Sequence, residues 1–375
     1  MYQNRISRRS MIALASGASL ASVLRLRSAP AVQTKFRPEK LGIALLGLGD
    51  YATNWLAPAI AQSTYGKVAG IVTGSPDKIS TWQEKYSIPD SGVFNYENLE
   101  DIASNKDIDI VYIVTPTGLH HKFAIRALEA GKHVICEKPM APTAEDCTRM
   151  IDAARKADRM LQIGYRLYWE PHHTRVMTAM RDKEFGKWES LETAFAGRMK
   201  DFDDPKNQWR IDKELGIAGA LYDLGVYAVQ AGFYTTQQHP IRVTATSSTD
   251  RKEIFNEVPE HWDWELEYAD GRKSIHWSSY GKNGNHLKMA TAEGSLEIER
   301  AYGYSGQSGV TPVGKMSFED VFQQTRQIDG QLLAIHRRNA NVVPGEMGRR
   351  DIRLINAVME SADSGKSVEL GKFDY

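Results

Sequence analysis

Three side chains in the middle of the chain have types and spacing suited to proton transfer: Lys138, Asp223 and Tyr227. Lys138 stands in the stretch CEKPM after an apolar run, and the proline that follows restricts its backbone. Asp223 and Tyr227 are four residues apart, so a helix would place them on one face. A tyrosine serves as a general acid or base when a nearby cation stabilises its phenolate, and Lys138 is the natural candidate. A surface lysine and a core tyrosine are the alternative interpretations.

A glycine-rich turn predicts a dinucleotide site. Residues 47–52 read GLGDYA, in which Gly47 permits the tight turn and Gly49 lets a pyrophosphate approach the backbone. The turn follows an apolar run and opens a helix, as the motif requires, and the helix N-terminus would attract the phosphates. We therefore expect Asp50 and Tyr51 to line the same site. A glycine turn without a ligand is the alternative.

The residues after the next strand favour NADP over NAD. Domains that bind NAD place Asp or Glu about 20 residues after the glycine turn, where it holds the ribose 2′-hydroxyl. Here the strand ends in VTGS (72–75), without a carboxylate, and Lys78 follows within one turn. The hydroxyl of Thr73, a helix N-terminus and an ammonium group suit a 2′-phosphate. The alternative for Lys78 is an ordinary solvated helix residue.

Two kinds of element must position these side chains. Between residues 41 and 165, short apolar runs alternate with helical patterns, which predicts a Rossmann domain with a doubly wound parallel sheet. Between residues 166 and 375, strands with hairpin turns dominate, and a helix at 218–234 carries Asp223 and Tyr227. This part predicts an α+β domain with an open, mostly antiparallel sheet, and its last two helices could pack back on the Rossmann domain.

One strand of the second part, HWDWELEY (261–268), has a strongly apolar face. Trp262 and Trp264 alternate with polar residues along it. That face is either core or an interface between chains, and we favour the interface.

The N-terminus looks like a targeting segment. Residues 1–31 carry five arginines and no acid, then an Ala/Ser/Gly-rich apolar segment, then Ala29-Pro30-Ala31. This order is typical of a secretory signal, and the pair Arg8-Arg9 resembles the twin-arginine type, which exports folded proteins. We therefore expect a periplasmic or otherwise exported protein, with residues 32–40 as a short arm. A disordered or membrane-touching N-terminus is the alternative.

Composition excludes several classes of protein. No apolar run is long enough to span a bilayer, so no membrane contact is expected after signal removal. Without residues 1–31, 42 basic residues would face 47 acidic ones, a net charge of about −5 that argues against nucleic acid. Cys136 and Cys147 are too few for a disulfide framework and are expected to be inert thiols. The histidines lack metal-ligand spacing and no HExxH occurs, so we predict no metal.

Several stretches together resemble a known family. GLGDYA, TPTGLHHKFAIRALEAGKHVICEKPM, IGYR, QWR and LYDLGVY follow the order and spacing of the glucose–fructose oxidoreductase, inositol dehydrogenase and rhizopine catabolism (Gfo/Idh/MocA) family, from about residue 41 to the end of the chain. The resemblance is to its glucose–fructose oxidoreductase branch. It implies that Lys138 positions the reacting hydroxyl, Tyr227 transfers the proton and Asp223 holds the sugar. It also implies a homodimer or homotetramer formed through the open sheet face.

The resemblance implies two overlapping sets of binding residues. The substrate-binding set is Lys138, Arg166, Asp223 and Tyr227. The cofactor-binding set is Gly47, Gly49, Asp50, Tyr51, Thr73, Lys78, Thr115, Pro116, His120, Glu137, Lys138, Arg166, Trp209 and Arg210.

The expected function is an NADP-dependent aldose oxidoreductase. Hydride would pass between C1 of a pyranose and a tightly bound nicotinamide, which a second sugar or carbonyl would recycle. An exported glycosidase of the same family, which oxidises its substrate transiently, is one alternative, although a histidine at position 227 would have favoured it. A non-catalytic sugar- or nucleotide-binding protein is another, and the joint presence of Lys138, Asp223 and Tyr227 argues against it.

Overall fold

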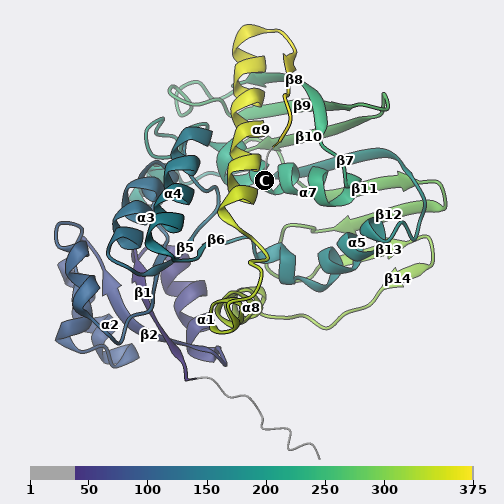
Figure 1. Cartoon of the computed structure of the whole chain (residues 1–375). Coiled ribbons are helices and arrows are strands. Elements are labelled where there is room, and N and C mark those ends of the chain that lie inside the picture. Colours follow the sequence, from purple (N-terminus) through teal and green to yellow (C-terminus); the bar gives the residue numbers. More distant parts are fainter. Residues whose placement is uncertain (1–38, 374–375) are drawn as a thin grey trace, which may run out of the picture. The chain divides into compact units, whose positions relative to one another are not determined.

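The computed structural model describes residues 39–373, so the expected leader (1–31) and most of the expected arm (32–40) lie outside the described residues. The described chain builds two sheets, which fall on either side of the expected boundary at residue 165 (Figure 1). The boundary itself stays a prediction.

The first sheet has six parallel strands in the order β3-β2-β1-β4-β5-β6. The strand β1 is buried along five of its six residues, as expected of a strand covered on both faces. The order reverses between β1 and β4, which opens a crevice at the carboxyl ends of the strands. The strands are β1 (Leu41–Leu46), β2 (Gly66–Val72), β3 (Val93–Phe94), β4 (Ile110–Ile113), β5 (His133–Cys136) and β6 (Leu161–Ile163). The helices of this half are α1 (Ala57–Gln62), α2 (Ile79–Tyr86), α3 (His120–Glu129) and α4 (Ala144–Ala157), whereas α5 (Pro171–Arg181) follows β6 and lies beside the second sheet (Figure 1).

The second sheet has nine strands in the order β14-β13-β12-β11-β7-β10-β9-β8-β15. Only β7 and β10 run parallel, and the other neighbours are antiparallel. The expected fold class is therefore confirmed. The strands are β7 (Trp188–Ala196), β8 (Pro240–Ser248), β9 (His261–Tyr268), β10 (Lys273–Ser279), β11 (Gly284–Thr291), β12 (Gly294–Glu299), β13 (Ser308–Thr311), β14 (Gly314–Met316) and β15 (Val368–Glu369).

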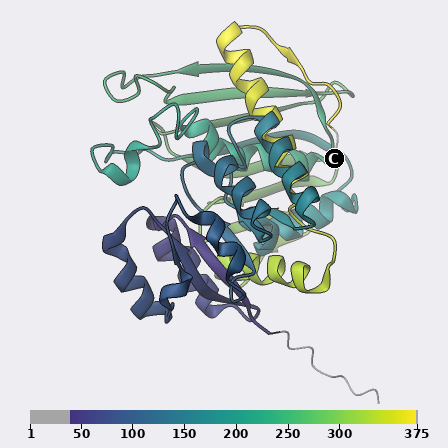
Figure 2. The same ribbon diagram turned by 60° about the vertical axis from the view of Figure 1, so that its left-hand side comes forward.

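Helices of the second half cover one face of this sheet and also reach the first. The helix α7 (Val226–Thr236) continues a π-helical turn, Leu221–Gly225, and packs against β7 and β10. The helix α8 (Gln323–Arg337) packs against α1, while α9 (Gly345–Ser364) lies between α4 and β8 (Figures 1 and 2). A short helix, α6 (Pro205–Gln208), lies in the connection between β7 and α7. The last two long helices thus join the two sheets.

The interface interpretation of Trp262 and Trp264 is wrong. Both side chains are only 2% exposed, and they belong to the core. Gly225 lacks a side chain, which lets the helical segment that includes it pack closely on Trp264. A Cβ at position 225 would lie only 3.3 Å from the Trp264 ring. The apolar face of β9 is covered by this chain's own helix, and the opposite face of the sheet is the open one.

Three expectations about special groups can be compared with the described residues. Cys136 and Cys147 are unpaired and fully buried, and burial raises the pKa of both thiols, as expected of inert cysteines. Between residues 39 and 373, no helix has the length and apolar character to cross a membrane. Within the same range, no three His, Cys, Asp or Glu side chains gather to hold a metal ion.

A buried histidine gives the fold a predictable sensitivity to acid. His276 on β10 has no exposed surface, and its ring nitrogens lie 2.7 Å from the hydroxyls of Thr193 and Ser274. Burial lowers its pKa to about 3, whereas an unfolded chain would protonate it near pH 6.5. Because the folded pKa is depressed, the stabilising contribution is complete above pH 6.5 and is lost as the pH falls. We expect His276 to contribute up to about 3 kcal/mol to the loss of unfolding free energy between pH 6.5 and 4.

Denaturant unfolding of wild type and His276→Gln at pH 7, 5.5 and 4 tests this expectation. The variant should be less stable than wild type at pH 7 and should lose less stability on acidification. Equal losses in the two proteins would contradict the assignment.

Candidate active site

A cleft of about 790 Å³ opens at the carboxyl ends of the first sheet's strands and continues toward the second sheet. The segments that follow β1, β2, β4 and β5 form one wall of the cleft. The opposite wall comes from α6, the π-helical turn before α7, and α7 itself. The predicted residues that line it are Gly47, Gly49, Asp50, Tyr51, Thr73, Lys78, Thr115, Pro116, Glu137, Lys138, Trp209, Arg210, Asp223 and Tyr227.

The glycine turn has the geometry of a phosphate cradle. Gly47 has a φ of +94°, and a Cβ there would lie 2.9 Å from the carbonyl oxygen of Val114. Gly49 faces open space, with no atom within 4 Å of where its Cβ would be. Thr115, on the next strand end, has a buried hydroxyl oxygen without a hydrogen-bond partner. A dinucleotide fits these features, because the open backbone would receive a pyrophosphate and the hydroxyl could pair with it or its ribose.

The end of β2 contributes hydroxyl groups and a cation. The cleft residues that follow this strand are Thr73, Ser75 and Lys78, none of which is a carboxylate. The hydroxyl of Thr73 accepts a hydrogen bond from the backbone of Ser75 at 3.0 Å. The Lys78 ammonium donates to the carbonyl of Leu48 at 2.9 Å, which places this cation beside the glycine turn.

Lys138 and Asp223 meet across the cleft although they are 85 residues apart. The Lys138 ammonium donates to the Asp223 backbone carbonyl at 2.7 Å and to its carboxylate at 3.2 Å. Arg210 Nε and the Tyr280 hydroxyl both donate to the other carboxylate oxygen, at 3.1 and 2.9 Å. Burial alone would raise the pKa of Asp223, but the charges on Lys138 and Arg210 hold it well below its usual range. Asp223 is therefore a carboxylate that only accepts hydrogen bonds.

Tyr227 stands at the cleft between two cations. The Lys138 ammonium lies 4.9 Å and the Arg166 guanidinium 5.0 Å from the centre of its ring. Phe195 and Tyr302 pack against the same ring at 5.3 and 5.8 Å. Burial would lower the pKa of Lys138, but nearby Tyr227 and Asp223 raise it, so the lysine is an ammonium. The Tyr227 ring therefore lies between two cations and is packed by two further aromatic rings.

Arg166 and His120 do not line the cleft, contrary to expectation. Arg166 is 1% exposed and lies behind Tyr227, where it donates to the carbonyls of Tyr302 and Gly303. His120 is equally buried, with ring nitrogens 2.9 and 2.7 Å from the carbonyls of Pro139 and Thr115. Both side chains therefore contact backbone carbonyl groups behind the cleft wall and do not form part of its surface. Buried carbonyl groups require hydrogen-bond partners, and these side chains supply them.

Glu137 faces the cleft but is 6% exposed. It accepts hydrogen bonds from the Tyr112 hydroxyl at 2.7 Å and from the Lys138 backbone at 3.2 Å. Gly164 leaves room for it, since a Cβ there would lie 2.5 Å from the carboxylate. Burial raises the pKa of Glu137. Its position supports the backbone that carries Lys138.

Several residues at the site were not predicted. Tyr304 and Trp55 line the cleft with ring centres 4.3 Å apart, and Tyr304 also covers Arg166. Trp55 is four residues after Tyr51, so helix spacing could have found it. Nothing in the sequence marks Tyr304, which the loop after β12 brings from the second sheet. The other unpredicted lining residues are Leu48, Ser75, Tyr96, Val114, Thr117, Pro139, Asp204, Pro205, Lys206, Asn207 and Tyr222.

Comparisons with known proteins agree with this architecture. The family described as "Oxidoreductase family, NAD-binding Rossmann fold" matches residues 41–165, and the "GFO/IDH/MocA C-terminal domain" matches residues 173–299. Together these matches cover more than half of the chain. The protein belongs to the Gfo/Idh/MocA family of oxidoreductases, as the sequence led us to expect.

Individual relatives are similar over most of the chain. A crystal structure of aldose–aldose oxidoreductase from Caulobacter crescentus complexed with glycerol is 35% identical, with a TM-score of 0.84 over 88% of this chain and 100% of that one. D-xylose 1-dehydrogenase [NADP(+)] from Haloarcula marismortui is 24% identical over 87% of this chain and 92% of its own. Levoglucosan dehydrogenase in complex with NADH and levoglucosan shares the fold, with a TM-score of 0.74 at 19% identity over 89% of this chain and 100% of its own.

Proposed function

We propose that this protein is an NADP-dependent aldose oxidoreductase that acts at C1 of a pyranose. The observation that carries the proposal is the convergence of Lys138, Asp223 and Tyr227 at the cleft that also contains the glycine turn. The similarity to an aldose–aldose oxidoreductase and to an NADP-linked xylose dehydrogenase supports the same substrate class.

The chain's own residues would divide the work as follows. Asp223 accepts hydrogen bonds from sugar hydroxyls, and Lys138 donates to the C1 oxygen and orients it. Tyr227 takes the proton from that oxygen in the oxidative direction and returns a proton in the reductive direction. The dinucleotide, when bound, accepts or supplies the hydride. Tyr304 and Trp55 cover the cleft beside Tyr227 and exclude water.

The preference for NADP rests on the residues after β2. Lys78 and the hydroxyls of Thr73 and Ser75 offer a cation and donors for a 2′-phosphate, and no carboxylate among them would repel it. We expect Lys78→Met to weaken NADP binding about tenfold and NAD binding by less than twofold, because one charge-assisted contact is lost. Titration of protein fluorescence with each nucleotide measures both changes. Equal weakening of the two would contradict a 2′-phosphate contact.

The nucleotide would remain bound and be recycled by a second sugar or carbonyl. The absorbance of the purified, desalted protein in the nicotinamide band, before and after addition of D-glucose or D-xylose, tests this. Reduction by an aldose followed by reoxidation by a second sugar supports the proposal. Bound nucleotide that no aldose reduces would favour the glycosidase, and a protein that binds sugar or nucleotide but turns over neither would favour a non-catalytic role.

Export is part of the proposal and rests on sequence alone, since residues 1–31 lie outside the described residues. The pair Arg8-Arg9 and the following apolar segment are typical of a route that carries folded proteins. Such a route would let the chain fold around its nucleotide first. N-terminal sequencing of the protein from the periplasmic fraction tests this. An uncleaved chain confined to the cytoplasm would contradict it.

Pairing of subunits would use the open face of the nine-stranded sheet. Ile275, the third residue of β10, lies on that face with 55% of its surface exposed. The family resemblance supports a dimer or tetramer there. Light scattering of wild type and Ile275→Glu tests it, and a monomeric wild type would contradict it.

A further inference from the structure

Tyr280 lies directly behind Asp223 and does not reach the cleft surface. Its side chain has no exposed surface, and its hydroxyl donates to Asp223 at 2.9 Å. Burial, and then the charge of Asp223, raise the pKa of Tyr280, so the hydroxyl keeps its proton and remains a donor. The hydrogen bond therefore fixes one oxygen of the carboxylate from behind the cleft wall.

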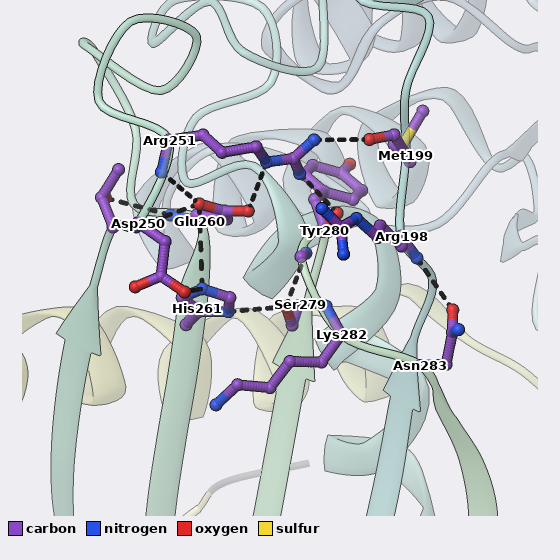
Figure 3. A network of polar contacts seen from close by, with 12 residues as sticks. Arg198, Met199, Asp250, Arg251, Glu260, His261, Ser279, Tyr280, Lys282 and Asn283 are labelled. Atoms are coloured by element: carbon purple, nitrogen blue, oxygen red, sulfur yellow. Dashed lines mark hydrogen bonds and ion pairs between the residues drawn. The ribbon is translucent and has the colours of Figure 1, made fainter.

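The backbone of Tyr280 is fixed in turn by an ion pair between half-buried Arg251 and buried Glu260. Arg251 Nε donates to the Glu260 carboxylate at 2.7 Å, and its terminal nitrogens donate to the carbonyls of Met199 and Tyr280 at 2.7 and 2.8 Å (Figure 3). The Tyr280 amide donates to the Glu260 carbonyl at 3.1 Å. The guanidinium also lies 5.0 Å from the ring of Phe255. Arg251 thus ties together three separate segments of the chain.

These segments meet next to the residues that contact Asp223. The parallel strands β7 and β10 end at the same edge, and the Met199 amide donates to the Tyr280 carbonyl at 2.9 Å. The chain then continues from Met199 to α6 and Arg210, which is the second cation on Asp223. Arg251 therefore anchors the two chain segments from which Tyr280 and Arg210 reach the Asp223 carboxylate.

The Glu260 carboxylate of this ion pair has several hydrogen-bond partners. The Glu260 side chain is 1% exposed and accepts further hydrogen bonds from the backbone amides of Asp250 and Arg251, at 3.1 and 2.9 Å. Burial would raise the pKa of Glu260, but the bonds from Arg251 outweigh it and lower the pKa. An ion pair that is partly or wholly buried adds little net stability over apolar packing. Its fixed geometry, with one guanidinium across three segments, points instead to a positioning role.

We propose that Tyr280, anchored by the Arg251–Glu260 pair, is a positioning residue that sets the Asp223 carboxylate for sugar binding. The inference rests on the proposed function and deepens it. Without the Tyr280 hydroxyl, the carboxylate would turn toward Arg210 and Lys138 and present a poorer acceptor to the sugar. Binding of the sugar should therefore suffer more than the chemical step.

Steady-state kinetics with D-glucose and D-xylose on Tyr280→Phe, Arg251→Lys and the double variant test the proposal. We expect each single variant to raise KM about tenfold or more, as for a lost hydrogen bond to a charged group, with kcat changed less than threefold and NADP binding unchanged. Because both act on one carboxylate, the double variant should be no worse than the poorer single variant. Additive effects, or a fall in kcat at constant KM, would overturn the proposal.

A matched control and a structural readout separate the possible failures. Arg175→Lys alters an arginine that also binds a glutamate, Glu184, by its side chain and stacks on a phenylalanine, but lies outside the cleft, so kinetics should be unchanged. If the wild type turns over no aldose, the proposed function fails. In that case, crystal structures of Tyr280→Phe and Arg251→Lys test the positioning role independently of the proposed function. An Asp223 carboxylate displaced from its wild-type position supports it, and an unmoved one overturns it.

Discussion

Tyr227→Phe should bind nucleotide normally and lose aldose turnover by about a thousandfold. The substitution removes one hydroxyl and leaves the ring in contact with Phe195 and Tyr302, and between Lys138 and Arg166. General acid–base catalysis by a positioned side chain contributes about 10² to 10⁴ in rate, and the Tyr227 ring lies within about 5 Å of both cations. Stopped-flow measurement of nicotinamide reduction by D-glucose separates the chemical step from nucleotide binding.

The control for this experiment is Tyr302→Phe. Tyr302 is a neighbouring buried tyrosine whose ring centre lies 5.8 Å from that of Tyr227, but it does not line the cleft. The same atom is removed, so any general loss of packing would appear in both variants. Full activity in Tyr227→Phe, or an equal loss in Tyr302→Phe, would disprove the assignment of Tyr227 as the proton-transfer group.

Lys138→Met should lower kcat by about 10² to 10³ and leave nucleotide binding nearly unchanged. The methionine keeps most of the length but removes the ammonium that lies 3.2 Å from the Asp223 carboxylate and 4.9 Å from the Tyr227 ring. Arg210 remains to pair with Asp223, so the carboxylate is not left without a cation. Because the pKa of Lys138 is raised, the ammonium persists through neutral pH, and the loss should be similar from pH 6 to 9.

Lys156→Met is the matched control, because this lysine is exposed on α4, outside the cleft. It should leave kcat and KM unchanged. The measurement is kcat at saturating NADP and D-glucose over the same pH range. If Lys138→Met retains activity within threefold of wild type, the ammonium has no part in orienting the C1 oxygen or in stabilising the phenolate.

The first sheet could be predicted almost completely from local patterns. The central strands β1 and β4 are almost wholly buried and are continuous apolar runs, and the glycine turn at 47–52 marks where the crevice opens. The second sheet was harder. Alternation along β9 located the strand and its apolar face but could not say whether that face was core or an interface. The interface prediction for Trp262 and Trp264 is wrong because a helix distant in sequence covers them.

The candidate site shows the same division. Lys138, Asp223 and Tyr227 were identified by residue type, spacing and resemblance, and the structure brings them together. Arg166 has the same chemistry as a ligand-binding arginine, yet it lies behind the wall, where backbone carbonyls of the loop after β12 required a donor. A single sequence does not indicate whether a cationic side chain contacts a bound ligand or a backbone carbonyl group.

By itself, the sequence determined the two types of sheet and the glycine turn of the first domain, and it predicted the NADP preference and the roles of Lys138, Asp223 and Tyr227. These features depend on residues within one turn or strand, where spacing and chemistry are local. The tertiary structure alone decided that Tyr280 holds Asp223 from behind, that Tyr304 covers the cleft and that His120 supports its wall. Those roles depend on distances between segments far apart in the chain, which packing of the two sheets against shared helices sets.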